Sequence, residues 1–308
     1  MRWASGPGQP PARFVAPPPP PKKGWGCFRV VMVLMVGSFL LCCCLVSAVA
    51  ESTDDPLDWD HVNKVVPADV GPKTSLGVAL VPEDLSPSLA RHFAWRQRLD
   101  AWELGYGVSG DVHQQVEDDF AALGSRFHYT SGAGNAFTWS PPASCLRHEW
   151  ECVFEALAHD NAEDLAPLSA LFRRKQQQEQ LDAREVTELV VGFVQNIKYR
   201  LPTEDTAAFG MLPPAIVVAD GSGDCDSKAL LAVVLLKQLG VDAVVLLASG
   251  LGHAALGVAL PVTGKKFGGR GQTKYAFVEV TAPGWALGAV PPEYDVANAW
   301  KVIPVVMP

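Results

Sequence analysis

A short polar segment in the last third of the chain runs directly into a long apolar one. Residues 221–228 read Gly-Ser-Gly-Asp-Cys-Asp-Ser-Lys, and the apolar residues 229–236 follow before Gly240 closes the run. This run is too long for a single strand between turns, so it predicts a buried helix. We expect Cys225 in the first turn of the helix, with Asp224 as the N-cap.

The position of Cys225 bears on its reactivity, because a thiol reacts as the thiolate. The unpaired N–H groups and the positive dipole end of a helix N-terminus stabilise the anion and lower the thiol pKa. Asp224 and Asp226 act in the opposite direction. A nearby histidine is therefore expected to supply the rest of the activation.

Three strands are predicted after the helix, and they bring two more polar residues together. The segments 243–247, 252–260 and 274–281 have strand character, and a glycine-rich basic loop separates the last two. An antiparallel hairpin around this loop places His253 directly opposite Glu279, with Cβ atoms roughly 4.5–5.5 Å apart. A carboxylate there would orient the imidazole and stabilise its protonated form, which completes a Cys–His–carboxylate set.

Each of these residues also has a plain structural interpretation. A lone cysteine is usually a small buried hydrophobe, and a lone histidine is usually a satisfied core or surface group. The order of cysteine on a helix, histidine on a strand and carboxylate on its hairpin partner favours chemistry. His253 shares its strand face with the small residues Ala255, Gly257 and Ala259, which would leave room for a substrate, while Leu256, Val258 and Leu260 face the other way.

Further segments resemble the transglutaminase-like superfamily, whose members have a papain-like fold. Residues 186–202 are similar to the helix and tyrosine-containing turn that precede the family's cysteine loop, and residues 277–285 to its final strand and Gly-Trp loop. The resemblance covers residues 182–297 and points to the bacterial or archaeal membrane-anchored type. The chain departs at the third catalytic position, where most relatives have aspartate followed by proline and this chain has Glu279 followed by Val280.

The resemblance implies an α+β fold with a papain-like transglutaminase core, in which the cysteine at a helix N-terminus packs on an antiparallel sheet. It implies acyl chemistry on a peptide or protein carboxamide, without a cofactor. Cys225 would attack the carbonyl, His253 would move the proton, and the thioester would pass either to water or to an amine. The oxyanion is expected at the Cys225 backbone N–H. Weaker candidates for substrate or oxyanion contacts are Tyr199, Asn196 and Trp285.

A second interpretation comes from the catalytically inactive members of this family. Such a chain would keep the fold as a binding module that recognises a cell-envelope peptide or protein. The complete set of Cys225, His253 and Glu279 favours the enzyme. The unusual third member keeps the binding module open.

The amino-terminal part predicts a membrane anchor. Residues 30–50 form an uncharged, mostly apolar run long enough to span a bilayer, with five basic and no acidic residues before it and a cluster of acidic residues after it. The positive-inside rule predicts a single-pass membrane protein with an extracytoplasmic, periplasmic C-terminal domain. The alternative is a signal peptide that is cleaved after Ala50, which would give a secreted protein.

The rest of the chain divides by composition and periodicity. Residues 1–29 are proline-rich and predict a disordered cytoplasmic tail, and residues 51–85 predict a tether. Residues 86–181 show helical spacing and predict a helical region ahead of the catalytic domain at 182–300. The helical sets are Trp95, Leu99 and Trp102; Val112, Val116, Phe120 and Leu123; and Leu165, Leu168, Leu171 and Phe172.

The seven cysteines predict one disulfide and no metal site. Four lie in or beside the apolar run, and Cys225 is the candidate nucleophile. Cys145 and Cys152 lie on the outer, oxidising side and predict a local disulfide, with separate packing as the alternative. Zinc held by Cys225, His253 and Glu279 is a weak rival, because no second cysteine or histidine stands near them in a ligand spacing.

Charge and motif spacing argue against two classes of partner. The formal net charge of −8 argues against nucleic acid. Residues 215–219 and the following Gly-Ser-Gly imitate the strand and glycine turn of a dinucleotide site. Asp226 occupies the place of the third glycine, and two acids would repel a pyrophosphate, so no nucleotide is expected. The basic loop with Lys265, Lys266 and Arg270 is interpreted as a solvated hairpin tip, with substrate contact as the alternative.

Overall fold

The computed structural model describes residues 73–83, 88–97, 99–132, 137–146, 148–202, 208–268, 271–296 and 298–307. The predicted tail at 1–29, the anchor at 30–50 and most of the tether lie outside these residues. Within the described ranges, no helix is both long and apolar enough to cross a bilayer. These residues form an α+β fold with six helices and several sheets, one of which is a curled antiparallel half-barrel.

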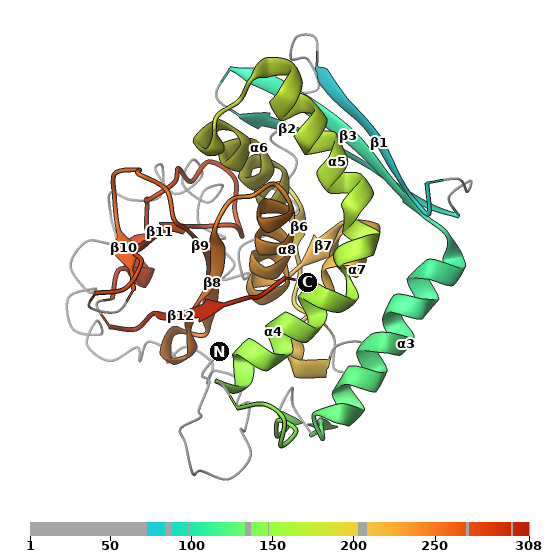
Figure 1. The fold of residues 1–308 in the computed structure, drawn as a ribbon, viewed down its shortest axis with the longest axis vertical. Coiled ribbons are helices and arrows are strands. Elements are labelled where there is room, and N and C mark those ends of the chain that lie inside the picture. The colour runs from blue at the N-terminus through green and yellow to red at the C-terminus, as the bar shows by residue number, and fades with distance from the viewer. Residues whose placement is uncertain are drawn as a thin grey trace, which may run out of the picture. The chain divides into compact units, whose positions relative to one another are not determined.

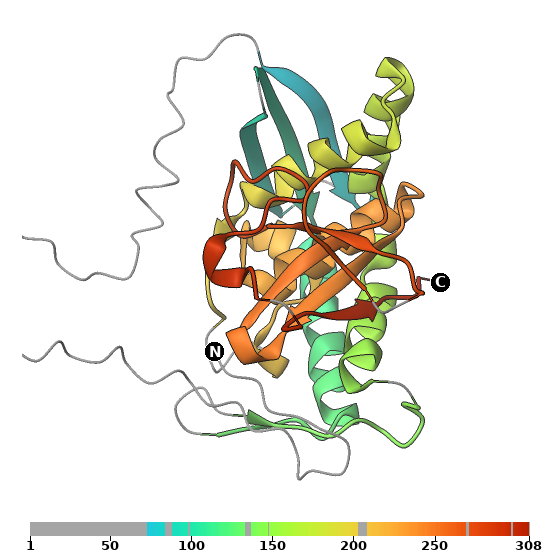
Figure 2. The ribbon, with the colours of Figure 1, turned by 90° about the vertical axis from the view of Figure 1, so that its left-hand side faces the viewer.

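The predicted apolar helix lies at the centre of the core. α8 (Cys225–Gln238) begins at the cysteine, and every residue from 225 to 236 is buried. One side of α8 packs on the antiparallel sheet β10-β11-β9-β8-β12, which Figures 1 and 2 show in orange and red. The strands β8, β9 and β11 fall where the sequence predicts strands. The bounds are β8 (Ala243–Ala248), β9 (His253–Val258), β10 (Lys266–Phe267), β11 (Tyr275–Val278) and β12 (Lys301–Pro304).

Four helices contact the other sides of α8, which allows a helix that is apolar on nearly all faces to be stable there. α6 starts with a capping box, in which Asp182 and Glu185 satisfy the first N–H groups. The residues that imitate the strand of a dinucleotide site form α7, so they are helical and not extended. The bounds are α4 (Glu149–Asp160), α5 (Ala162–Glu179), α6 (Ala183–Gln195) and α7 (Pro214–Asp220).

A three-stranded sheet replaces the first helix that the sequence predicts. Trp95 and Trp102 are cross-strand partners in an antiparallel pair, and Leu99 lies in the connection, 92% exposed. The helix prediction for these residues was wrong, because spacings of four and three residues suit the two arms of a tight hairpin as well as a helix face. The strands are β1 (Thr74–Val81), β2 (Leu89–Gln97) and β3 (Asp100–Val108), in the order β1-β3-β2, and β1 falls inside the predicted tether.

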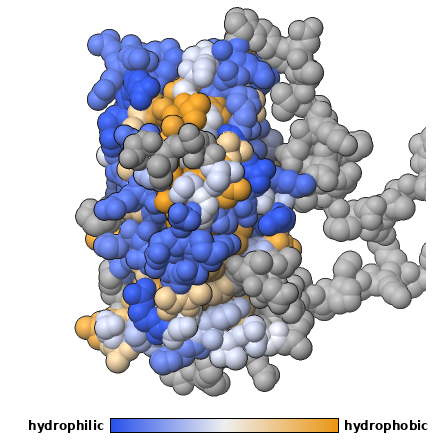
Figure 3. Space-filling view, turned by 90° about the vertical axis from the view of Figure 1, so that its right-hand side faces the viewer, coloured by the Kyte–Doolittle hydropathy of each residue, from blue (hydrophilic) through white to orange (hydrophobic). Residues whose placement is uncertain are grey.

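This sheet packs against helices through one face. Trp95, Leu104 and Tyr106 are each 1% exposed, β2 contacts α6 and α7, and β1 contacts α5. Figure 3 shows the side of the molecule on which β1 lies, where hydrophilic residues predominate around smaller hydrophobic areas. The sheet is therefore a one-sided layer, buried on its helix side.

The other two predicted helical sets are confirmed. α3 (Gly110–Arg126) buries Val116, Phe120 and Leu123, and the side chain of Ser109 caps its start. α5 buries the predicted set Leu165, Leu168, Leu171 and Phe172. The remaining elements are short: β4 (Thr130–Ser131), β5 (Phe137–Thr138), β6 (Lys198–Tyr199), β7 (Ser222–Gly223), η1 (Ala208–Gly210), η2 (Ser249–Leu251) and η3 (Pro292–Tyr294).

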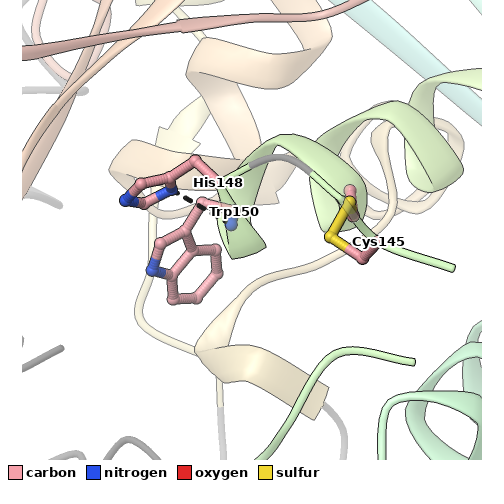
Figure 4. Close-up of a disulfide and its surroundings, with 4 residues drawn as sticks. Cys145, His148 and Trp150 are labelled. Atoms are coloured by element: carbon pink, nitrogen blue, oxygen red, sulfur yellow. Dashed lines mark hydrogen bonds between the residues drawn. A yellow bond between two sulfur atoms is a disulfide. The ribbon is translucent and has the colours of Figure 1, made fainter. Parts of the chain in front are cut away.

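A disulfide joins Cys145 to Cys152, with Cα atoms 6.0 Å apart. Figure 4 shows the bond beside the start of α4, where His148 is the N-cap and its Nδ1 accepts a hydrogen bond from the backbone N–H of Trp150. The Trp150 side chain is buried. Closing so short a loop stabilises the fold by ~2–3 kcal/mol, mainly by restricting the unfolded chain. The bond and the cap together fix where α4 begins.

Candidate active site

The start of α8 holds Cys225 through its neighbours. Asp224 is the N-cap, as predicted, and its Oδ1 accepts hydrogen bonds from the Ser227 backbone N–H (3.1 Å) and the Ser227 hydroxyl. Ser227 Oγ in turn accepts from the backbone N–H of Leu212 at 2.8 Å. Cys225 is the first residue of the helix, so the helix ladder offers its N–H no acceptor.

His253 and Glu279 meet, although not in the predicted register. His253 Nε2 lies 2.9 Å from Glu279 Oε2, and both residues are buried. In the ladder Val278 pairs with Leu256, so its continuation places Ala255 opposite Glu279, and His253 lies diagonally. The predicted direct pairing of His253 with Glu279 was wrong by two residues. A register shift of two keeps both side chains on the same face of the sheet. The diagonal separation accounts for glutamate at 279, because the longer side chain bridges a greater distance.

Two residues hold Glu279 in place. The Thr281 N–H and hydroxyl donate to Glu279 Oε1 at 2.8 and 2.6 Å, and Gln195 Nε2 donates to the Glu279 carbonyl at 2.8 Å. Burial alone would raise the pKa of Glu279, but the bonds from His253 and Thr281 outweigh burial and lower the pKa. The ionised carboxylate accepts a hydrogen bond from the Nε2–H of His253, so in the neutral imidazole the lone pair is on Nδ1.

The sulfur of Cys225 lies beside the start of β9, where the nearby backbone N–H of Ala254 favours the thiolate. Burial, and then the Asp226 and Asp224 carboxyls, raise the pKa of Cys225 well above its ordinary value. The helix terminus was expected to lower this pKa. That expectation was wrong, because desolvation and two nearby acids outweigh the helix dipole. The resting thiol is therefore neutral at neutral pH.

Asp224 and Asp226 are two buried acids on either side of Cys225. Burial raises the pKa of Asp224 to about 6, and burial together with Asp224 raises the pKa of Asp226 well above its ordinary value. Within the described ranges, Asp224 Oδ2 and Asp226 Oδ1 have no hydrogen-bond partner. In the same ranges, the one group close enough to share a metal ion is Asp224, Cys225 and Asp226, with ligand atoms within 4.8 Å of one another. The predicted zinc alternative with His253 and Glu279 is not such a group.

Aromatic rings lie against the imidazole. The Tyr294 ring stacks on His253, with ring centroids 4.0 Å apart and 14° between the planes. Trp300 meets the imidazole edge-on at 6.0 Å, and its Nε1 donates to the Tyr294 carbonyl at 3.0 Å. His253 is only 4% exposed. The Tyr294 ring therefore covers one face of the imidazole.

The small residues beside His253 do not leave an open space. Ala255 lies in a cluster with Phe267, Phe277 and Trp300, whose rings fill the volume that the sequence predicts for substrate. Gly257 has no room for a side chain, because a Cβ there would lie 2.8 Å from Val244 Cγ2. The opposite face carries the predicted Leu256 and Val258 in the main core, and the predicted Leu260 packs against it. Ala254 lies in the same core.

Tyr199 is the weaker candidate that lies near the nucleophile. Burial raises the pKa of the Tyr199 phenol. Cys225 and Asp224, which lie near it, raise this pKa further. The Asn196 side chain donates to the carbonyl of Gly192 at 2.8 Å, a bond within its own helix. This bond does not involve the thiol.

Trp285 lies at a different place. It lines a cavity of about 230 Å³ together with Gln195 and Arg96, and Cys225 and His253 are not among the lining residues. Its carbonyl accepts from Gln195 Nε2 at 2.9 Å. Trp285 therefore belongs to the support of the Glu279 segment, and the structure does not bring it to the thiol.

Comparison with known proteins finds no relative of this chain. No known family model, curated protein or solved structure matches it.

Four residues at the site escaped the sequence prediction: Gln195, Lys228, Tyr294 and Trp300. Gln195 and Lys228 carried a signal, since each is a polar residue in an otherwise apolar helical pattern, and a fully buried lysine is rare unless it is paired. Tyr294 and Trp300 follow the last predicted strand and carry no spacing signal. Their contacts with His253 depend on the path of the loop.

Proposed function

We propose that the chain is a transglutaminase-like cysteine enzyme that performs acyl transfer or hydrolysis on a peptide or protein carboxamide through a thioester. The supporting observation is the buried His253–Glu279 pair, joined at 2.9 Å, beside a cysteine at a helix start. Three residues from α8, β9 and the end of β11 form this set. No metal or cofactor is required for the chemistry.

The geometry suits a neutral thiol that loses its proton during attack. Nδ1 of His253 accepts the thiol proton as the sulfur bonds to the carbonyl carbon, and Glu279 stabilises the imidazolium. The oxyanion meets the Cys225 N–H. His253 then gives the proton to the leaving nitrogen as the C–N bond breaks. Water or an amine next attacks the thioester carbonyl and gives its proton to His253. The C–S bond then breaks, and the sulfur takes this proton back from His253, which restores the thiol.

A specific observation favours the second candidate, a non-catalytic module that binds a cell-envelope peptide or protein. Cys225 is 2% exposed, and burial with Asp226 and Asp224 raises its pKa. Such a thiol can also be a purely structural residue. The two candidates differ in whether Cys225 accepts an acyl group.

We expect the full-length chain to give a burst of about one p-nitrophenolate per chain with p-nitrophenyl acetate, and an acetyl group on Cys225 by mass spectrometry. Nucleophilic catalysis predicts such a burst. Cys225→Ala should abolish it, and any burst that remains in this variant would come from the cysteines outside the described residues. His253→Ala should slow it strongly, because the general base is lost. Acetylation of Cys225 that is equally fast in His253→Ala would favour the binding module.

We also propose that the catalytic domain faces outward from a single-pass anchor at residues 30–50. Support comes from the basic residues before the run and the acidic residues after it, and from the Cys145–Cys152 bond, since disulfides persist in oxidising compartments. A reporter fused after Pro308 should be active only outside the cytoplasm. Activity inside the cytoplasm would refute the orientation. Release of the protein from membranes would favour cleavage after Ala50.

A further inference from the structure

Lys228 is a buried cation one helical turn after Cys225. Its side chain is 0% exposed, and its Nζ donates to the carbonyls of Ile197 (2.7 Å), Thr281 (3.2 Å) and Gln195 (3.4 Å). An ammonium group has three N–H donors, so these carbonyls use all of them. The lysine thus joins the nucleophile helix to the end of α6 and to the segment after β11.

Both of those segments hold Glu279. Thr281 donates twice to Glu279 Oε1, and Gln195 donates to the Glu279 carbonyl. Lys228 binds the carbonyl oxygens of these same two residues. The path from the nucleophile helix to the imidazole therefore runs through Lys228, Thr281 and Glu279 to His253.

The sheet alone does not fix Glu279. The ladder between β11 and β9 ends at Val278, one residue earlier, so no strand hydrogen bond of that pair positions the carboxylate. Burial lowers the pKa of Lys228 to about 7, while the nearby Glu279, Asp224 and Cys225 act in the opposite direction and favour its protonated form.

We propose that Lys228, Gln195 and Thr281 form a clasp that positions Glu279, and through it His253, for reaction at Cys225. Lys228 and Thr281 are positioning residues, since neither needs to touch the substrate. This inference rests on the proposed function. It adds that the nucleophile helix itself supplies the group that aligns the other two members of the set.

Lys228→Met keeps most of the side-chain volume and removes the charge and the donors. In the full-length chain we expect the p-nitrophenyl acetate burst to slow by ~10²-fold, because small misplacements of catalytic groups have effects of this size. The ester concentration at half-maximal rate should stay unchanged, because Lys228 acts on the position of Glu279 and not on ester binding. Lys175→Met is the matched control: Lys175 is also buried, but it pairs with Glu179 and lies over Trp102. It should change neither quantity.

Thr281→Val tests the clasp independently and keeps the branched shape of the side chain. Its burst rate should fall about tenfold, with an unchanged ester concentration at half-maximal rate. If Lys228→Met fails to fold, as judged by circular dichroism, this variant decides. Wild-type burst rates in folded Lys228→Met, or in Thr281→Val alone, would overturn the clasp while the proposed function stands. A burst that is absent from the wild-type chain would remove the proposed function, and with it the clasp that rests on that function.

Discussion

Glu279→Gln is expected to lower the acylation and turnover rates by up to ~10⁴-fold while leaving the fold intact. Glutamine fills the same space and can still accept a hydrogen bond from His253, but it carries no charge to stabilise the imidazolium and can favour the wrong tautomer. The burst rate with p-nitrophenyl acetate measures the effect, and a thermal melt checks the fold. Full activity in this variant would mean that Glu279 is not the third member, and Asp220 and Asp295 would be tested next.

Glu279→Asp separates charge from reach. Aspartate keeps the charge, but position 279 lies diagonal to His253. A side chain shorter by one methylene should fall short of Nε2, so we expect a rate between those of the wild type and Glu279→Gln. A rate equal to the wild type would show that the strands adjust to the shorter side chain.

Asp226→Asn is expected to lower the pKa of Cys225. Burial and the Asp226 and Asp224 carboxyls raise this pKa, and the amide removes one ionisable group at nearly constant volume. Each unit of decrease gives tenfold more thiolate below the midpoint, while the lower basicity of the sulfur reduces its nucleophilicity by about threefold, so alkylation should speed up about threefold per unit. The pH profile of iodoacetamide labelling provides the measurement.

The control for this change is Asp220→Asn. Asp220 lies a few residues earlier, is partly exposed and contacts His113 at 3.5 Å. It should leave the labelling midpoint unchanged. A midpoint that stays in place or moves upward in Asp226→Asn would show that Asp226 does not hold the thiol neutral.

The sequence predicted the elements of the site better than their relative placement. The apolar run after Cys225 and the strands around His253 and Glu279 follow from local patterns, because a buried helix and buried strands need continuous apolar surface. The register of the hairpin does not follow from local patterns. The loop between the strands contains an additional short strand, β10, and a shift of two residues conserves every face, so alternation could not detect it.

Two other errors have physical causes. Trp95 and Trp102 are seven residues apart, a spacing common to two helical turns and to a hairpin, and only tertiary packing on α6 and α7 decides between them. The thiol pKa was predicted from the helix terminus, the two adjacent acids and a nearby histidine, without the effect of desolvation. The desolvation that reverses its direction depends on segments far away in the sequence, including those that contribute Tyr199 and Tyr294 near the sulfur.

The burial of α8 has a consequence for how chemical reagents reach the site. Its first twelve residues are buried between a sheet and four helices, so local opening of this helix would expose much of the core and cost nearly as much as global unfolding. Its amide hydrogens should therefore be among the last to exchange with deuterium. A reagent that modifies Cys225 faster than these amides exchange must enter through motion of side chains such as Tyr294, with the helix itself intact.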